Sequence, residues 1–204
     1  MRNGTSTTQM IDLLERCKDR PALFNEMFLK RPPYWSRQMD LCRSVVNYRT
    51  TVAYSGNMVG KDYWIAGTVL WWLLTRPDSL CIITGPSQLL LGSVTFKEIK
   101  RCLDGAVIPF GGKFSSGLWS SPAVIEIAPG WHGLGFSTTS VERASGQHAA
   151  HLLAVVEEAS GVDDFVRIIT STPPGGSPAT CPRAWAATAP ASWSWTTGAC
   201  SRSC

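Results

Sequence analysis

The chain has 204 residues, with 19 lysines and arginines against 15 aspartates and glutamates, and a formal net charge of +4. This length suffices for one hydrophobic core, and the weak positive charge permits a polyanionic partner without identifying one. The seven cysteines include no Cys-x-x-Cys pair. The odd count and scattered spacing argue against a disulfide framework and indicate reduced thiols, as in a cytoplasmic protein.

Neither a secretory leader nor a membrane segment is expected. Residues 1–9 are polar and lack the apolar centre of a signal peptide. The longest apolar run, residues 64–74, is too short to span a bilayer and is typical of a buried helix.

The first 50 residues have the pattern of a helical lead-in. Apolar residues over 11–29 have the spacing of one or two amphipathic helices, interrupted at Pro21. A Pro-Pro pair then breaks the chain, and residues 34–46 return to a helical pattern. We therefore expect residues 1–50 to precede the main sheet as a helical segment.

A glycine-containing loop lies between a predicted strand at residues 51–54 and a predicted helix at 63–74. Its sequence is Ser55-Gly56-Asn57-Met58-Val59-Gly60-Lys61-Asp62. A strand, a loop ending in Gly-Lys and a helix bind a nucleoside triphosphate, because backbone N–H groups and the helix N-terminus face the phosphates. The lysine adds a full positive charge. All eight residues are candidate nucleotide-binding residues.

The loop departs from the common pattern at both ends. Ser55 stands where glycine is usual, and Gly56 can supply the tight turn instead. Asp62 stands where a Ser or Thr usually ligates Mg²⁺, and its carboxylate is a candidate ligand because Mg²⁺ prefers oxygen donors. The alternative is an ordinary turn, with Asp62 stabilising the N-terminus of the following helix.

Strands and helices alternate after the loop. We expect a strand at 80–84, a helix at 88–103 and a hairpin formed by strands at 123–128 and 133–138. A continuous apolar run at 152–156 is typical of a central parallel strand. The pattern predicts an α/β fold with a mainly parallel sheet and helices on both faces, over residues 51–166.

Two carboxylates follow the apolar run. In additional-strand ATPases such a strand ends in an acidic residue that organises Mg²⁺ and a glutamate that polarises the attacking water. Glu157 is therefore the candidate metal residue, and Glu158 the candidate general base that acts with Lys61. The alternative is a pair of solvated glutamates. The two motifs predict a P-loop NTPase of this RecA-like class, with a three-layer α/β/α core.

Residues 167–204 differ in kind from the rest of the chain. From Ser171 onward there is no Leu, Ile, Val, Phe or Met, and no acidic residue. Such a composition cannot form an ordinary aliphatic core, so we expect an irregular, low-complexity tail. Its residue types are those of GC-rich codons read in an unintended frame. A frameshift after Phe165 is one hypothesis, and a natural disordered tail is the other.

Four passages together resemble the ATPase domain of phage large terminase subunits, the motors that package DNA into procapsids. The likeness extends over about residues 20–165. The most specific passage is the acidic strand with its Glu-Ala-Ser-Gly-Val continuation. The passages are PYWSRQ (33–38), SGNMVGKD (55–62), IITGPS (82–87), and ASGQH (144–148) with VVEEASGV (155–162).

The resemblance implies an ATP- and Mg²⁺-dependent motor domain of a phage or prophage terminase, cut short before the family's nuclease domain, so no nuclease activity is expected. It implies that Gln38 recognises adenine, against the alternative of an ordinary residue of an amphipathic helix. It also implies that Arg143 acts as an arginine finger across a subunit interface. The alternative is that Arg143 is a surface arginine beside Glu142. The implied partners are double-stranded DNA, a portal protein, a small terminase subunit and further copies of the chain, in the host cytoplasm.

Two rival functions stay open. The unusual tail favours a non-catalytic remnant that binds nucleotide without turnover. The core motifs are also shared with helicase-like ATPases that act on nucleic acid.

Overall fold

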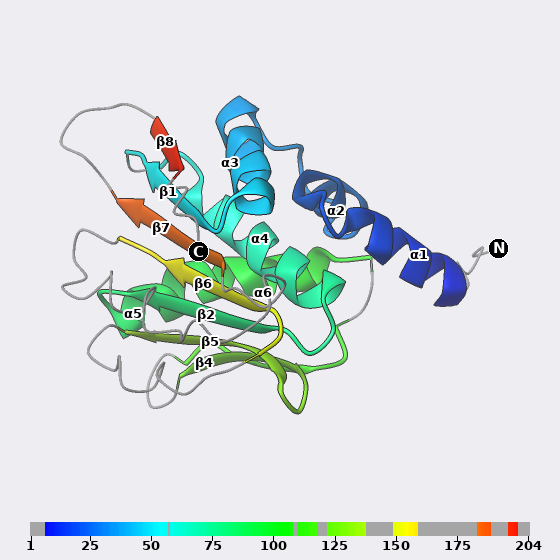
Figure 1. Ribbon diagram of the computed structural model, residues 1–204. Coiled ribbons are helices and arrows are strands. Elements are labelled where there is room, and N and C mark those ends of the chain that lie inside the picture. The colour runs from blue at the N-terminus through cyan, green and yellow to red at the C-terminus, as the bar shows by residue number, and fades with distance from the viewer. Residues whose placement is uncertain are drawn as a thin grey trace.

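The computed structural model describes residues 7–56, 58–107, 110–117, 122–137, 149–158, 183–188 and 196–199. Three helices come first, helices and strands alternate from β1 to α6, and the remaining described elements are strands (Figure 1). The helices are α1 (Thr7–Cys17), α2 (Pro21–Met27), α3 (Ser36–Asn47), α4 (Lys61–Thr75), α5 (Gln88–Leu90) and α6 (Phe96–Gly105), with a π-helical turn η1 (Leu91–Thr95) before α6. The strands are β1 (Thr50–Tyr54), β2 (Leu80–Gly85), β3 (Lys113–Ser115), β4 (Ala123–Ala128), β5 (Trp131–Ser137), β6 (Leu152–Val156), β7 (Arg183–Thr188) and β8 (Thr196–Ala199).

The strands form one sheet in the order β3-β4-β5-β2-β6-β7-β1-β8. Its centre, from β5 through β2, β6 and β7 to β1, is parallel. The two edges are antiparallel, with β3, β4 and β5 on one side and β8 on the other. The predicted mainly parallel α/β sheet is confirmed, as is the hairpin between β4 and β5.

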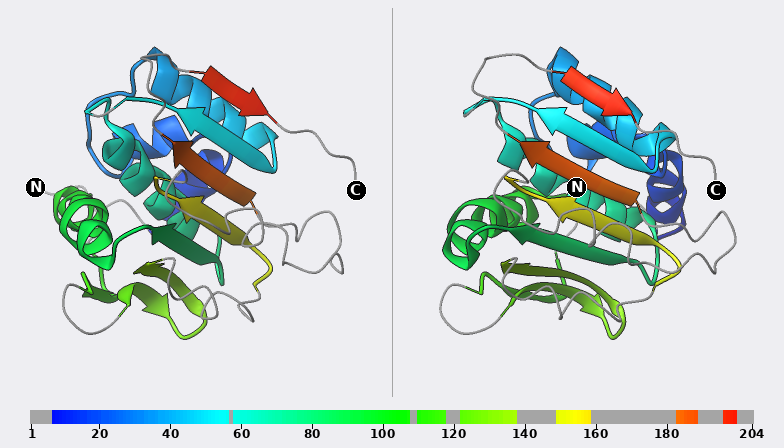
Figure 2. Two further views of the ribbon diagram at one scale, coloured as in Figure 1. Left: turned by 90° about the vertical axis from the view of Figure 1, so that its left-hand side faces the viewer. Right: turned by 60° about the vertical axis from the view of Figure 1, so that its left-hand side comes forward.

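The strand β7 lies between β6 and β1, so it separates the acidic strand from the strand that leads into the glycine loop (Figure 2). It is the additional strand that the predicted fold class requires. Its residues belong to the segment for which the sequence predicts an irregular tail, and the structure differs there. Pairing in a sheet uses backbone groups, so a segment without Val, Ile or Leu can still supply a strand.

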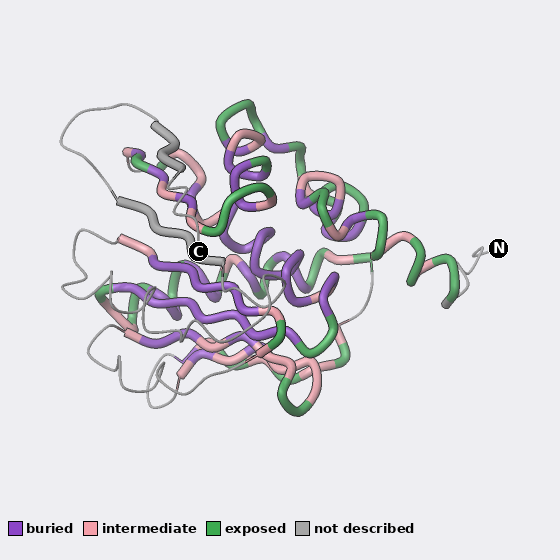
Figure 3. The backbone as a smooth tube through the Cα atoms, viewed as in Figure 1, coloured by how far each residue is buried: buried purple, intermediate pink, exposed green. Residues whose placement is uncertain are grey.

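The main core lies on one face of the sheet, where α4 is the central helix. Residues Trp64 to Leu73 of α4 are all buried, which explains why this helix is apolar on every side. In Figure 3 the buried residues run along α4, β2 and β6. Helices α1, α2, α3 and α6 all contribute to the same core cluster. The indole of Trp71 donates a hydrogen bond of 2.8 Å to the Cys17 carbonyl and so ties α4 to α1.

A smaller apolar cluster lies on the opposite face, formed by Leu80, Ile82, Phe136 and Leu152. Side chains alternate between the faces of a strand, so Cys81 and Ile83 face the main core. Residues of α1, α2, α3, α4 and α6 belong to the main core, and the second helical layer of the predicted three-layer core stays a prediction. None of the described helices combines the length and apolarity needed to cross a membrane.

Candidate nucleotide site

Three parallel strands, β1, β2 and β6, end at the same edge of the sheet, and a cavity lies there. Its walls come from the glycine loop, the first turn of α4, the segment after β2, the π-helical turn and the end of β6. Parallel α/β sheets bind ligands at this edge. The lining residues are Met58, Lys61, Asp62, Gly85, Pro86, Ser87, Leu90, Leu91, Val94, Glu157 and Glu158.

The glycine loop enters α4 through a left-handed residue. Gly60 has φ +82° and immediately precedes the helix, a conformation that costs glycine little. No described side chain caps the N-terminus of α4. The first backbone N–H groups of a helix have no partner within the helix, so this end favours an anion.

Lys61 lies at the centre of the site. Its side chain is only 9% exposed, and its Nζ donates a hydrogen bond of 2.6 Å to Oε1 of Glu158. Glu158 has φ +50°, in the left-handed region that side chains other than glycine rarely adopt. Such backbone strain is often found at functional sites. The structure thus brings the loop lysine and the candidate base together.

Glu157 and Asp62 form a second contact in the same cavity. Burial, together with a hydrogen bond with Asp62, raises the pKa of Glu157 to about 8, although the hydrogen bond from Thr95 acts to lower it. Two carboxyl groups this close cannot both carry a full charge without compensation. A shared proton provides that compensation, and a divalent cation provides it equally well.

The residues present fit a magnesium-bound phosphate ligand. Among the described residues, the hydroxyl of Ser55 at the start of the loop is buried and has no hydrogen-bond partner. The Lys61 ammonium group lines the cavity itself. Within the described part of the chain no group of three or more His, Cys, Asp or Glu side chains could hold a metal. Mg²⁺ needs only one or two protein carboxylates, because water and phosphate oxygens complete its coordination.

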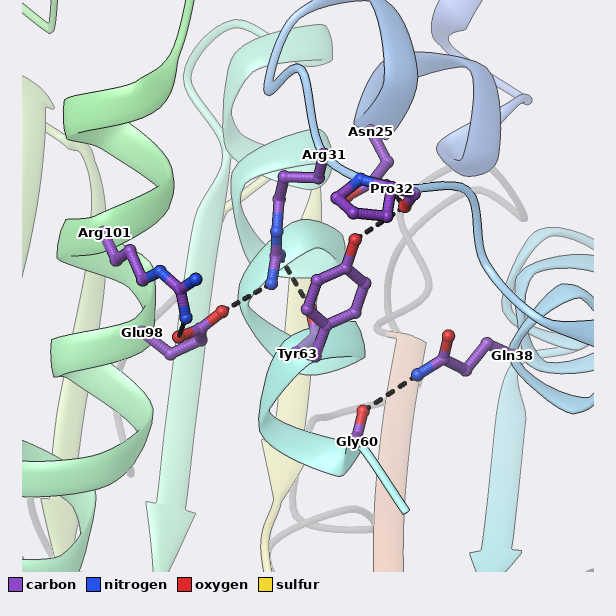
Figure 4. A network of polar contacts seen from close by, with 8 residues as sticks. All are labelled: Asn25, Arg31, Pro32, Gln38, Gly60, Tyr63, Glu98 and Arg101. Carbon is purple, nitrogen blue, oxygen red and sulfur yellow. Dashed lines mark hydrogen bonds and ion pairs between the residues drawn. The ribbon is translucent and has the colours of Figure 1, made fainter. Parts of the chain in front are cut away.

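Gln38 contacts the loop from α3. Its amide Nε2 donates a hydrogen bond of 3.0 Å to the carbonyl of Gly60, and its side chain is buried (Figure 4). Recognition of adenine by Gln38 stays a prediction. In the structure its amide nitrogen is bonded to the loop backbone, so it braces the turn that leads into α4.

Two solved structures share this fold, and both are the large terminase ATPase domain of Thermus phage P74-26. The match to that domain has a TM-score of 0.53 and 14% sequence identity, and covers 92% of this chain and 70% of the other. The match to a point mutant of the domain has the same TM-score and identity, with coverage of 90% and 69%. No protein-family model and no curated protein matches the sequence. The chain has the fold of a phage terminase ATPase domain.

The other loop residues differ in exposure. Gly56 and Val59 are half-buried, while the side chain of Met58 is fully exposed. Asn57 and the candidate arginine finger, Arg143, lie outside the described residues. Both stay predictions.

Sequence reasoning missed a polar network that holds the first turn of α4. Arg31 donates hydrogen bonds to the Tyr63 carbonyl at 2.8 Å and to Glu98 Oε1 at 2.5 Å, and its guanidinium stacks 3.5 Å from the centre of the Tyr63 ring. Glu98 also pairs with Arg101, and the hydroxyl of Tyr63 donates to the Pro32 carbonyl (Figure 4). The network joins the segment before α3 to α4 and α6. No spacing pattern in the sequence indicates it, because its members come from distant segments.

Proposed function

We propose that this chain is the ATP-hydrolysing motor domain of a phage-type terminase large subunit. The observation that carries the proposal is that Lys61, Asp62, Glu157 and Glu158 line one cavity at the carboxyl edge of a terminase-like sheet. The fold supports a terminase-type domain, and the convergence of these four side chains supports ATP hydrolysis as its chemistry.

Each side chain has a distinct task in the proposed reaction. Lys61 and the N–H groups of the loop bind the β- and γ-phosphates, where negative charge accumulates in the transition state. Asp62 and Glu157 are the residues that would hold Mg²⁺, which offsets phosphate charge when bound. The buried cavity keeps these groups close together before the nucleotide arrives.

Glu158 is the proposed base. It orients a water molecule in line with the γ-phosphorus and accepts a proton from that water as the new P–O bond forms. The bond between the γ-phosphorus and the β–γ bridging oxygen breaks, and ADP carries away that electron pair. For this role Glu158 must release Lys61, which then pairs with the phosphates.

The wider assembly follows from the same proposal. A terminase motor acts on double-stranded DNA with a portal protein and a small terminase subunit, in the host cytoplasm. It works as a ring of subunits, in which Arg143 is the proposed arginine finger towards the neighbouring copy. We propose no nuclease activity for this chain.

The experiment is a multiple-turnover phosphate-release assay on the full chain, with and without double-stranded DNA. We expect magnesium-dependent turnover that DNA stimulates and that Lys61→Ala abolishes. The control is Lys113→Ala, because Lys113 pairs at 3.2 Å with Glu126 on the antiparallel edge. Nucleotide binding without turnover in the wild type would favour the non-catalytic remnant. Strand separation coupled to turnover would favour a helicase-like enzyme.

A further inference from the structure

One wall of the cavity is the π-helical turn η1, which interrupts the helix that the sequence predicts at 88–103. Leu91 and Val94 of this turn line the cavity, and Thr95 at its end is fully buried. The hydroxyl Oγ1 of Thr95 donates a hydrogen bond of 2.6 Å to Oε2 of Glu157. Single π-helical turns within α-helices are frequent at functional sites.

Phe96, the residue after Thr95, packs against β5 and so fixes how far Thr95 lies from the sheet. A Cβ at Gly135 would lie only 2.3 Å from the Phe96 ring, so the bare glycine lets that ring lie directly on β5. Phe96 is fully buried there. The position of the Thr95 hydroxyl is therefore set by a rigid contact between the helix and the sheet.

Glu157 is held from two sides. Its backbone N–H donates a hydrogen bond of 2.8 Å to the Thr84 carbonyl at the end of β2, and its carboxylate accepts the bond from Thr95. The backbone contact fixes where the residue sits, and the hydroxyl contact restricts how the carboxylate turns. Asp62 lines the same cavity as this carboxylate.

We propose that Thr95 is a positioning residue that orients Glu157 towards Asp62 for divalent-cation binding. The inference rests on the proposed function of the cavity. The loop of this site has Asp62 where a Ser or Thr is usual, and Thr95 supplies a hydroxyl group from a different segment. Partners that hydrogen-bond a metal ligand typically change metal affinity about 10- to 100-fold when they are removed.

The test measures Mn²⁺ binding to the full chain by electron paramagnetic resonance in the presence of a non-hydrolysable ATP analogue. Thr95→Val should weaken Mn²⁺ binding about 10- to 100-fold. Thr95→Ser retains the hydroxyl and should restore it. Binding of the analogue in EDTA should be unchanged in both variants, because Thr95 is not placed against the phosphates.

The matched control is Thr75→Val. This variant also removes a buried threonine hydroxyl bonded at 2.6 Å, but to the Trp71 carbonyl at the far end of α4. It should bind Mn²⁺ like the wild type. Thermal unfolding of each variant checks folding, and Thr95→Ala replaces Thr95→Val if the valine variant does not fold.

The outcomes separate this inference from the proposed function. The role of Thr95 would be overturned if Thr95→Val bound Mn²⁺ as tightly as the wild type does. It would also be overturned if Thr75→Val lost as much Mn²⁺ affinity as Thr95→Val. Neither result would contradict the proposed ATP hydrolysis. A wild type that binds the analogue but no Mn²⁺ would also overturn the role of Thr95. A wild type that binds neither would end the proposed function as well.

Discussion

Lys61 and Glu158 stand 97 positions apart in the sequence, and their side chains form an ion pair of 2.6 Å. The pair compensates the charge of a lysine that is almost completely buried. In the proposed reaction a phosphate ligand competes with Glu158 for the same ammonium group. Binding of the ligand and release of the carboxylate would then be one exchange, which would leave Glu158 free to face water.

Replacement of Glu158 by glutamine should separate nucleotide binding from turnover. Glu158→Gln removes the competing charge, so ATP affinity should rise. Phosphate release should fall about 100-fold or more, because the base is lost. Titration with a fluorescent ATP analogue and a phosphate-release assay measure the two effects. Glu126→Gln, which removes the acid of a pair on the antiparallel edge, is the control and should change neither. Weaker ATP binding in Glu158→Gln would contradict the exchange.

A methyl group at Gly60 should damage the loop. Gly60→Ala places a side chain at φ +82°, and the new Cβ would lie 2.9 Å from the amide nitrogen of Gln38. Left-handed backbone costs an alanine about 1–2 kcal/mol, and the clash adds to that cost. We expect a lower free energy of unfolding in urea and a loss of ATP binding.

Gly130 provides a control with the same backbone and no clash. It also has φ +82°, in the turn between β4 and β5, and nothing lies within 4 Å of an added Cβ. Gly130→Ala should destabilise the fold by the backbone cost alone and leave ATP binding unchanged. If the two variants were equally stable and bound ATP equally well, the Gln38 contact would have no importance.

The buried pair of Arg31 and Glu98 should contribute more than an exposed pair. The exposed side-chain fractions are 9% and 18%, against 69% and 37% for Arg43 and Asp40. A double-mutant cycle of unfolding free energies with Arg31→Met and Glu98→Gln should give a coupling of about 1–3 kcal/mol. The matching cycle at Arg43 and Asp40 should give about 0.5 kcal/mol or less. Similar couplings in both cycles would argue against a structural role for the network.

The buried thiols should resist alkylation in the folded protein. Burial raises the pKa of Cys42 to about 12 and that of Cys102 to about 11, and burial also raises the pKa values of Cys17 and Cys81. Only the thiolate reacts, so labelling of the native chain with iodoacetamide should stay low at pH 8. In denaturant the four thiols regain an ordinary pKa of about 8.5 and should react. Peptide mass spectrometry measures both states, and rapid native labelling at any of the four would contradict this packing.

The sequence was sufficient to predict the elements that carry local signals. The loop from Ser55 to Asp62 combines glycines, a lysine and a following apolar helix, and each of these has a short-range physical reason. The apolar run before Glu157 similarly predicts a central strand. These two segments contain the charged residues of the site, so the convergence of Lys61 with Glu157 and Glu158 could be expected before any coordinates.

Other features leave no local signal. The π-helical turn that carries Thr95 adds one residue to a helical turn and so shifts the α-helical repeat of 3.6 residues. A single sequence does not reveal such an insertion. The strand β7 lacks the Val, Ile and Leu residues by which strands are usually recognised. The bond from Gln38 to Gly60 and the network around Arg31 depend on how separate segments pack, and no spacing pattern predicts such contacts.

The position of β7 bears on how the protein is made. The strands β1 and β6, which carry the two halves of the site, do not touch, and β7 joins them through backbone pairing on both sides. A ribosome releases β1 first, β6 about a hundred residues later and β7 later still. The edges that β1 and β6 turn towards β7 therefore stay unpaired until residue 188 has emerged, and the lysine and its carboxylate partner become fixed relative to each other only then.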